Sequence, residues 1–514
     1  MSAHGHSFLG PLKWAFVMNW GDRAFSLIFV VVLASILGPY DFGVVMLALV
    51  YIEFIRLFLE GGVQTALIQR GELRREHLDS AFWVNLVWCL VLAGLSVALS
   101  GWWARVNDVP ELADVVKVLS ILLVTQGLTI VQLGLFQRQM RFKALALRET
   151  SAVVVGGVIG LVLALQGAGV WALVAQQLGH AGMQLLLLWG MSTWRPSLRF
   201  SPASARELVR YSSGVFLANL GGFVNRRADA LLIGLFFGPT VVGLYRLADR
   251  FVDNVLEVTL RPIGHVSLPF LSRLQHDRAA LRDAVASFVR MTLIGTVPVM
   301  LIVAACSGLL VDVLPPEWND AGDVLRLLAV VGIGKAVVFF TGPLLFAVAR
   351  PHLRAAMLWV LAVLSAGVVV LVGVLLADAS IRDQAVGMAG SRALYFLVVV
   401  IPLNIAVICW ITGLRPRSLL TWLPAPLASG AAAIGAVAGL EAVGALDRLP
   451  PIPALVVGGA SASLAAIGVL FALEPRARAL VPPLVRRAAG REPEVVQAAA
   501  ARPTLTTEWS ARDR

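Results

Sequence analysis

Residues 219–261 read NLGGFVNRRADALLIGLFFGPTVVGLYRLADRFVDNVLEVTLR. Their apolar runs have the pattern of two membrane helices joined by a tight turn at Gly238 and Pro239. Ionisable residues recur along both runs: Arg226, Arg227, Asp229, Arg246, Asp249, Arg250, Asp253 and Glu257. Because such side chains are costly at membrane depth, they usually face a protein-lined or water-filled cavity. We therefore predict that this hairpin belongs to the functional site.

The composition of the whole chain indicates a membrane protein with many spans. Of its 514 residues, 58% are hydrophobic and only 14% are charged, whereas a soluble domain is about one quarter charged. The net charge of +11 does not indicate nucleic-acid binding, because the arginines lie in short runs between apolar segments, as in cytoplasmic loops. The three cysteines lie in apolar segments and the histidines form no ligand cluster. We expect no disulfide framework, metal site or cofactor.

Windows of roughly 20 apolar residues predict about fourteen transmembrane helices. They lie near 14–37, 43–67, 80–104, 115–135, 149–166, 170–190, 208–237, 240–263, 284–310, 323–349, 354–377, 385–411, 421–442 and 452–473. Arginine-rich connections alternate with acidic or uncharged ones, which predicts an even number of spans with both termini in the cytoplasm. Tryptophans near span ends predict an interfacial belt: Trp102, Trp103, Trp189, Trp194, Trp318 and Trp422.

An internal repeat divides the predicted spans. LGPYDFG at 37–43 and FGPTVVG at 237–243 each end one apolar run and open the next. The predicted spans between them are even in number, so the copies share one orientation and indicate two bundles related by an axis along the membrane normal. We expect an N-terminal six-helix bundle at 1–191, a cytoplasmic linker at 192–207, a C-terminal six-helix bundle at 208–411, two additional transmembrane helices at 412–473 and a disordered cytoplasmic tail at 474–514.

A polar stripe follows Gly243. Arg246, Arg250, Asp253 and Glu257 recur at spacings of three and four, which places them on one helix face. One interpretation is a cavity face on which Arg246 and Arg250 meet an anionic ligand. The other is internal pairing, of Arg250 with Asp253 and of Glu257 with Arg261. The two interpretations can both hold.

Two earlier spans carry similar pairs. Arg226 and Asp229 are three residues apart on one face, and Arg226 lies too far from either helix end to reach the interface easily. Glu53 and Arg56 have the same spacing near the middle of the second span, and Glu60 lies further along it. These positions predict a cavity function.

Two further cations complete the candidate set. Lys335 lies near the middle of the tenth span with no acid nearby in sequence, so it is a candidate for binding an anion. Arg23 lies closer to the cytoplasmic face, where an interfacial position is an equal alternative. The glycines before Lys335 do not have the spacing of a phosphate-binding loop, so no ATPase is indicated.

Seven segments together resemble the bacterial oligosaccharide flippases of the multidrug/oligosaccharidyl-lipid/polysaccharide exporter superfamily. They are DFG at 41–43, TALIQR at 65–70, HLDSAFWVN at 77–85, QRQMRFKALALRE at 137–149, GVWALVAQQL at 169–178, WRPSLRFS at 194–201 and DALLIGLFFGPTVVGLYRLADR at 229–250. Their order and spacing cover roughly the first 290 residues. Two positions depart from the family: Glu60 stands where it usually has aspartate, and Arg246 with Asp249 where it more often has small or aromatic residues.

The resemblance implies an all-α membrane protein with two six-helix bundles in a V shape and two additional C-terminal helices. It implies a flippase that moves a polyprenyl-diphosphate-linked oligosaccharide across the bacterial inner membrane by alternating access. Arginine matches phosphate geometry with two parallel hydrogen bonds. We therefore expect a diphosphate-binding cavity lined by Arg23, Arg56, Arg226, Arg246, Arg250 and Lys335, with supporting or ion-coupling acids Glu53, Glu60, Asp229, Asp253 and Glu257. Candidate partners are the lipid-linked oligosaccharide, membrane lipids, and a polysaccharide polymerase with its export machinery.

Two other functions would require different features of the sequence. An ion-coupled exporter of drugs or small molecules has the same architecture and would use the acids Glu53, Glu60, Asp229 and Asp253. A membrane glycosyltransferase or polymerase would need a long periplasmic loop, and no predicted periplasmic connection exceeds about a dozen residues. We therefore expect a transporter and not an enzyme.

Overall fold

The computed structural model describes residues 25–59, 75–139, 141–197 and 202–474. Within these ranges the chain is helical and contains no strand, which confirms the predicted all-α class. A short apolar helix, Phe25–Ala34, comes first. It is followed by α2 (Pro39–Arg56), α4 (Arg75–Val106), α5 (Leu112–Leu119), α6 (Ile121–Arg138), α7 (Phe142–Leu165), α8 (Val170–Met191), α9 (Pro202–Arg273), α10 (Arg278–Ala305), α11 (Ser307–Val311), η1 (Pro316–Trp318), α12 (Asp320–Val338), α13 (Thr341–Ala347), α14 (Pro351–Leu375), α15 (Ile381–Tyr395), η2 (Phe396–Val400), α16 (Ile401–Thr412), α17 (Pro416–Leu420), α18 (Pro424–Ala442) and α19 (Pro451–Leu473).

Ten helical runs in the described part of the chain are long and apolar enough to cross a membrane. The predicted first span lies partly outside the described residues, and α2 and α8 are not among the ten. Both helices are rich in polar residues: α2 carries Asp41, Glu53 and Arg56, and α8 carries glutamines and a histidine. The count of fourteen therefore stays a prediction.

The polar residues of α8 bind partners on α7. Glu149 accepts hydrogen bonds from Arg148 at 2.8 Å and from Gln184 at 3.0 Å. His180 lies 3.4 Å from the same carboxylate. Helices inside a membrane associate through such polar contacts and through small residues, so this cluster stabilises the pairing of α7 with α8.

The hairpin predicted at Gly238 is confirmed. Helix α9 is 72 residues long, but Gly238 has φ 78° and ψ −174°, which no helical residue adopts. The Tyr245 hydroxyl donates a hydrogen bond to Asp229, 16 residues earlier, at 3.4 Å. In a straight helix these residues would be about 24 Å apart. The chain therefore reverses at Gly238, and we call 202–237 the first arm of α9 and 239–273 its second arm.

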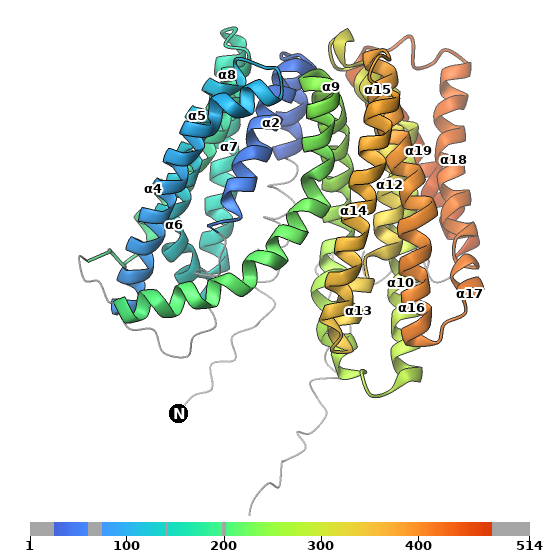
Figure 1. The fold of residues 1–514 in the computed structure, drawn as a ribbon. Helices are drawn as coiled ribbons and strands as arrows, with labels where there is room; N and C mark the ends of the chain where they lie inside the picture. The colour runs from blue at the N-terminus through green and yellow to red at the C-terminus, as the bar shows by residue number, and fades with distance from the viewer. Residues whose placement is uncertain (1–24, 60–74, 140, 198–201, 475–514) are drawn as a thin grey trace, which may run out of the picture.

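The helices form two groups that meet at one end (Figure 1). The N-terminal group consists of Phe25–Ala34, α2 and α4 to α8, and the C-terminal group of α9 to α16. Helices α18 and α19 pack on each other and against α10. We call the end where α2 meets the turn of α9 the closed end, and the opposite end, where the groups diverge, the open end (Figure 1).

This arrangement agrees with the predicted V shape, while the predicted domain boundaries stay predictions. The tail after 474 lies outside the described residues. Part of the predicted linker does so too, and α9 is already helical from Pro202, within that predicted linker.

The two copies of the repeat pack against each other at the closed end. A Cβ on Gly43 of α2 would lie 1.8 Å from the Pro239 carbonyl oxygen of α9. A Cβ on Gly243 of α9 would lie 1.9 Å from the Pro39 carbonyl oxygen of α2. Each glycine thus faces the proline of the other copy, which is the reciprocity that a two-fold axis produces. Only glycine permits so close an approach of two backbones.

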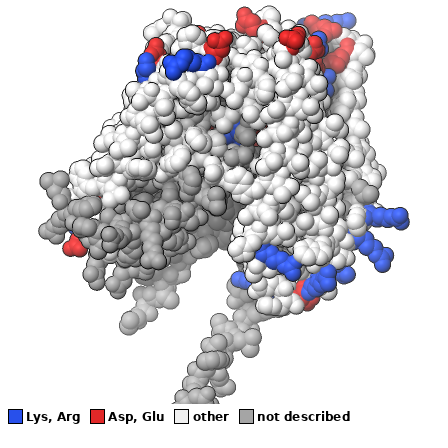
Figure 2. All heavy atoms as spheres, in the orientation of Figure 1, with Lys and Arg blue, Asp and Glu red and all other residues white. Residues whose placement is uncertain are grey.

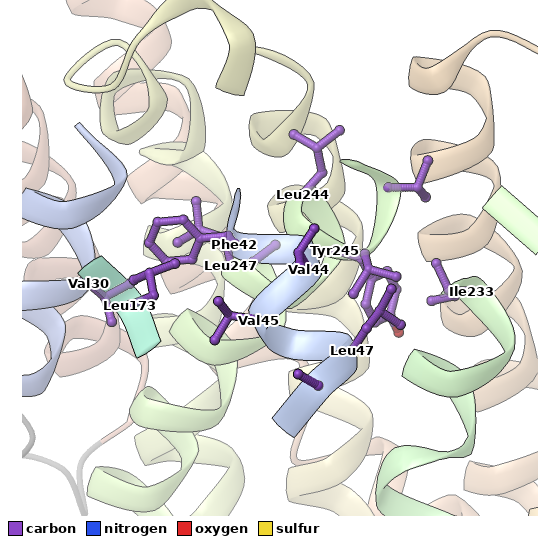
Figure 3. Packing of buried hydrophobic residues seen from close by; sticks show 14 of the residues in the cluster. Val30, Phe42, Val44, Val45, Leu47, Leu173, Ile233, Leu244, Tyr245 and Leu247 are labelled. Atoms are coloured by element: carbon purple, nitrogen blue, oxygen red, sulfur yellow. The ribbon is translucent and has the colours of Figure 1, made fainter. Parts of the chain in front are cut away.

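Apolar side chains surround this backbone contact. Val44, Val45 and Leu47 of α2 lie against Leu244 and Leu247 of the second arm (Figure 3). All are at most 4% exposed. Lipid tails are as apolar as these side chains, so close packing, and not the expulsion of water, must hold helices together at membrane depth. The closed end is therefore a dry, tightly packed seam between the two groups.

Trp318 corrects one part of the predicted interfacial belt. It is 0% exposed and not at a lipid surface. Its Nε1 donates to the Leu37 carbonyl oxygen at 3.0 Å, and its ring meets the Phe42 ring edge-on at a centroid distance of 5.3 Å. Trp318 therefore joins the C-terminal group to the N-terminal group at the closed end.

Trp318→Phe is expected to lower the free energy of unfolding by about 1–3 kcal/mol, because the Leu37 carbonyl oxygen would lose its indole donor. Trp318→Ala should cost about 3–5 kcal/mol, since a cavity would remain. Thermal unfolding of the purified protein in detergent measures both. Trp102→Phe is a suitable control because Trp102 is 50% exposed. Equal effects at both positions would contradict the assigned role.

Candidate functional site: a charged network between the helix groups

Charged side chains gather on the open-end side of the apolar seam. They come from α2, both arms of α9, α12 and α15. Basic atoms are visible inside the hollow between the two groups (Figure 2). The predicted residues that the structure brings together here are Glu53, Asp229, Arg246, Asp253 and Lys335. The network divides into three contacts, of which the first is the most deeply buried.

The most deeply buried contact joins Asp229 to Arg392. Arg392 Nη1 of α15 lies 3.0 Å from Asp229 Oδ2 of α9, and the two side chains are 13% and 4% exposed. Tyr245 and the backbone N–H of Ala230 also donate to Asp229. The Arg392 guanidinium lies 5.9 Å from the centre of the Phe396 ring, in the π-helical turn η2, which is within the range of a cation–π contact. Each charge is thus compensated.

The second contact centres on Lys335 of α12. Its Nζ lies 2.8 Å from Asp253 Oδ1 and 3.6 Å from Asp249 Oδ1. The other oxygen of Asp249 accepts a hydrogen bond from Arg246 Nη1 at 2.7 Å. Arg246 and Asp249 are each 12% exposed, whereas Lys335 is 27% and Asp253 51% exposed. This contact therefore extends from the buried charges of Arg246 and Asp249 to the more exposed Lys335 and Asp253.

The third contact crosses between the groups. Arg227 of the first arm of α9 donates from Nε to Glu53 Oε2 at 2.6 Å and from Nη2 to Oε1 at 2.9 Å. This bidentate geometry is the strongest that arginine and a carboxylate adopt. The side chains are 27% and 34% exposed, so both are reachable from solvent.

The other predicted residues surround this network or lie beyond what the structure describes. Arg250 Nη2 donates to Ser26 Oγ in the first apolar helix at 3.1 Å, a further polar contact between the groups. Arg56 is partly buried, and its Nε has no hydrogen-bond partner among the described residues. Glu257 lies further toward the open end on α9 and is half-buried. Arg23 and Glu60 lie outside the described residues, as does the side chain of Arg226.

Three members of the network are absent from the predicted site: Arg227, Asp249 and Arg392. An arginine in a predicted span is itself a signal of a functional position, and it could have identified Arg392. Arg227 points to the other helix group, where it binds Glu53. Asp253 of the stripe is bound by Lys335 from α12, a partner outside the stripe.

The cations of this network have the donor chemistry that an anion such as a phosphate requires. Arginine forks suit phosphate oxygens, and the lysine supplies a point charge beside them. Among the residues that the structure describes, no group of three or more His, Cys, Asp or Glu side chains is placed to hold a metal ion. The acids instead neutralise the cations, which makes them tolerable at membrane depth.

Comparison with solved structures identifies the fold. The chain superposes on the lipid II flippase MurJ in its inward closed conformation with a TM-score of 0.68 and 12% identity, covering 92% of this chain and 99% of that one. It superposes on an inward-facing multidrug resistance MATE family transporter with a TM-score of 0.59 and 15% identity, covering 76% and 96%. A polytopic helical fold with a charged cavity between two helix groups defines the class, a membrane transporter.

The chain belongs to the polysaccharide biosynthesis protein family, whose profile matches residues 32–322. It is 28% identical to the succinoglycan biosynthesis transport protein ExoT of Rhizobium meliloti (strain 1021) over 353 residues, which cover 65% of this chain and 71% of the relative. It is 28% identical to the lipopolysaccharide biosynthesis protein WzxC of Escherichia coli (strain K12), over 66% of this chain and 69% of that protein. The family predicted from the sequence segments is confirmed.

Proposed function

We propose that this protein flips a polyprenyl-diphosphate-linked oligosaccharide from the cytoplasmic to the periplasmic leaflet, for export of a surface polysaccharide such as O-antigen, exopolysaccharide or capsule. The observation that carries the proposal is the set of cations at membrane depth between the two helix groups, above all Arg227, Arg246 and Lys335. A diphosphate headgroup needs such donors to leave water, while its prenyl tail can stay in lipid. The names of ExoT, a transport protein, and MurJ, a lipid II flippase, support the same class of cargo.

The charges at the two ends support an orientation with the open end toward the cytoplasm. Basic residues at the open end include Arg273, Arg278, Arg282, Arg415 and Arg417. Acidic residues at the closed end include Glu111, Asp114, Glu317 and Asp320. Figure 2 shows acidic side chains gathered along the closed end. By the positive-inside rule the basic end faces the cytoplasm, so the cavity would load its cargo from the cytoplasmic leaflet of the bacterial inner membrane.

Transport then requires the cavity to change sides. In this conformation the seam around Gly43 and Gly243 closes one end of the molecule, which is the periplasmic exit in the orientation that we propose. Opening that seam while the groups close at the other end would expose the headgroup to the periplasm, which is alternating access. The residues of the chain act in this cycle by binding and releasing charge, as in a transporter and not in an enzyme.

An ion-coupled exporter of small molecules is the second candidate. The observation that favours it is Asp253, whose side chain is 51% exposed and could bind a cationic substrate. Binding measurements separate the two functions, because a diphosphate lipid and a cationic drug require opposite charges in the cavity.

Charge reversal at Arg250 tests the proposal in cells. In a strain lacking the gene, Arg250→Glu and Lys335→Glu should restore little surface polysaccharide, with transport reduced roughly 10- to 100-fold, because each replaces a phosphate donor by a repelling charge. The lipid-linked oligosaccharide should accumulate inside, which mass spectrometry of the extracted lipids measures. Arg282→Glu is the control, since Arg282 lies near the start of α10 and is 46% exposed. Normal surface polysaccharide at normal protein level in both cavity variants would overturn the proposal.

A further inference from the structure

The Glu53–Arg227 contact joins two parts of the molecule that move apart in any alternating-access cycle. Glu53 belongs to α2, in the N-terminal group. Arg227 is fixed to the C-terminal group, because Asp229, two residues later, binds Arg392 of α15. Gly221 of the same arm also lies against Trp359 of α14. The ion pair is therefore a link between groups and not a contact within one of them.

This link lies at a different depth from the apolar seam. Glu53 is ten residues beyond Gly43 on α2, which is about 15 Å along the helix axis. The seam is closed by backbone packing and apolar side chains, and a ligand in the cavity cannot reach it. The ion pair, with a quarter to a third of each side chain exposed, can be reached. A ligand can therefore act on the link without entering the seam.

The Glu53 carboxylate and a phosphate group would compete for the same edge of the Arg227 guanidinium. Nε and Nη2 of Arg227 are both occupied by the two oxygens of Glu53. A phosphate group presents two oxygens in nearly the same geometry to the same edge of the guanidinium. Only one of the two anions can occupy that edge, so a headgroup that binds there displaces the Glu53 carboxylate.

We propose that Glu53 occupies the place of the cargo's phosphate on Arg227, so that binding of a diphosphate headgroup displaces it and releases the link between the two helix groups. Empty protein is then held with its cavity open to the cytoplasm, and loaded protein is free to open the seam. This inference rests on the proposed function and assigns Glu53 a positioning and coupling role in it. Arg250, which also crosses between the groups to Ser26, would contribute to the same link.

Glu53→Gln separates this role from a purely structural one. The variant removes the competing charge, so a diphosphate should bind roughly three- to tenfold more tightly. The link is weakened at the same time, so the ligand-free protein should open its closed end more often, and added ligand should change that opening less than in the wild type. If the ion pair had only a structural role, Glu53→Gln would loosen the site and the diphosphate would bind less tightly.

The measurement uses the full chain in lipid nanodiscs. Farnesyl diphosphate is the ligand, and farnesol is the uncharged comparison for binding to the prenyl chain alone. Spin labels at Asp114 and Asp378, which are exposed at the closed end of each group, report the opening through their distance distribution. Glu474→Gln is the control, because Glu474 accepts equally short hydrogen bonds from Arg290 Nη2 with its two carboxylate oxygens, at 2.7 and 2.8 Å, and this ion pair does not cross the two groups.

The outcomes distinguish the two proposals. If wild-type protein binds farnesyl diphosphate no better than farnesol, the proposed function fails, and the inference fails with it. If the wild type binds the diphosphate selectively but Glu53→Gln binds it equally or less tightly, only the inference fails. Should Glu53→Gln misfold, the double variant Glu53→Gln with Arg227→Gln leaves no unpaired charge, and it should fold, open spontaneously and show no response to ligand. A ligand response equal to that of the wild type in the double variant would overturn the inference.

Discussion

Gly43→Ala is expected to separate the two helix groups at the closed end and to abolish transport. In an ordinary helix this substitution stabilises by up to about 1 kcal/mol, because alanine is the better helix former. Here the added Cβ would lie 1.8 Å from the Pro239 carbonyl oxygen. Backbone cannot rotate away as a side chain can, so the groups would have to separate by at least about 1 Å, at a cost of about 3 kcal/mol or more.

The distance between labels at Asp114 and Asp378 measures this separation, after Cys89, Cys306 and Cys409 have been replaced by serine. The distribution should broaden and shift to longer distances in Gly43→Ala and, by the reciprocity of the contact, in Gly243→Ala. Gly94→Ala is the control, because a Cβ at Gly94 of α4 would meet no atom within 4 Å. A distance distribution for Gly43→Ala that matches the control would contradict the packing of the seam.

Arg392→Met is the second substitution with a large expected effect. It would leave the Asp229 carboxylate, 4% exposed, without its cationic partner. Removing one partner of a buried ion pair costs about 3–5 kcal/mol, much of it from the uncompensated charge that remains. We expect the thermal transition in detergent to fall markedly and the yield of folded protein to decrease.

A double-mutant cycle separates the contact from general damage. Asp229→Asn with Arg392→Met leaves no unpaired charge, so it should be clearly less destabilised than the sum of the two single variants. Lys117→Met, at a solvent-exposed pair with Asp114, should leave the transition almost unchanged. Additive losses in the double variant would mean that Asp229 and Arg392 do not stabilise each other.

The reversal at Gly238 and the positions of the charged residues could be predicted from the sequence, because both signals are local. Hydropathy and a Gly-Pro pair suffice to predict a reversal at Gly238, since a helix cannot continue through that backbone conformation. The repeat that begins near Gly38 and Gly238 could be found by comparing the chain with itself, and its last glycines, Gly43 and Gly243, form the contact between the groups. Charges at membrane depth identified α9 as the centre of the site for the same reason: their cost depends mainly on depth.

The partner of each charge was decided by tertiary structure. Lys335 has no acid nearby in sequence, yet it lies 2.8 Å from Asp253, which is 82 residues away. Arg227 and Glu53 are 174 residues apart and meet only because α2 and α9 form one interface. Helical periodicity shows which residues share a face, but it does not show which face of another helix packs against them. By itself, then, the sequence determined the membrane class, the family, the hairpin and the positions of charge, whereas the packing of α2, α9, α12 and α15 determined which charges neutralise one another and which remain open to a ligand.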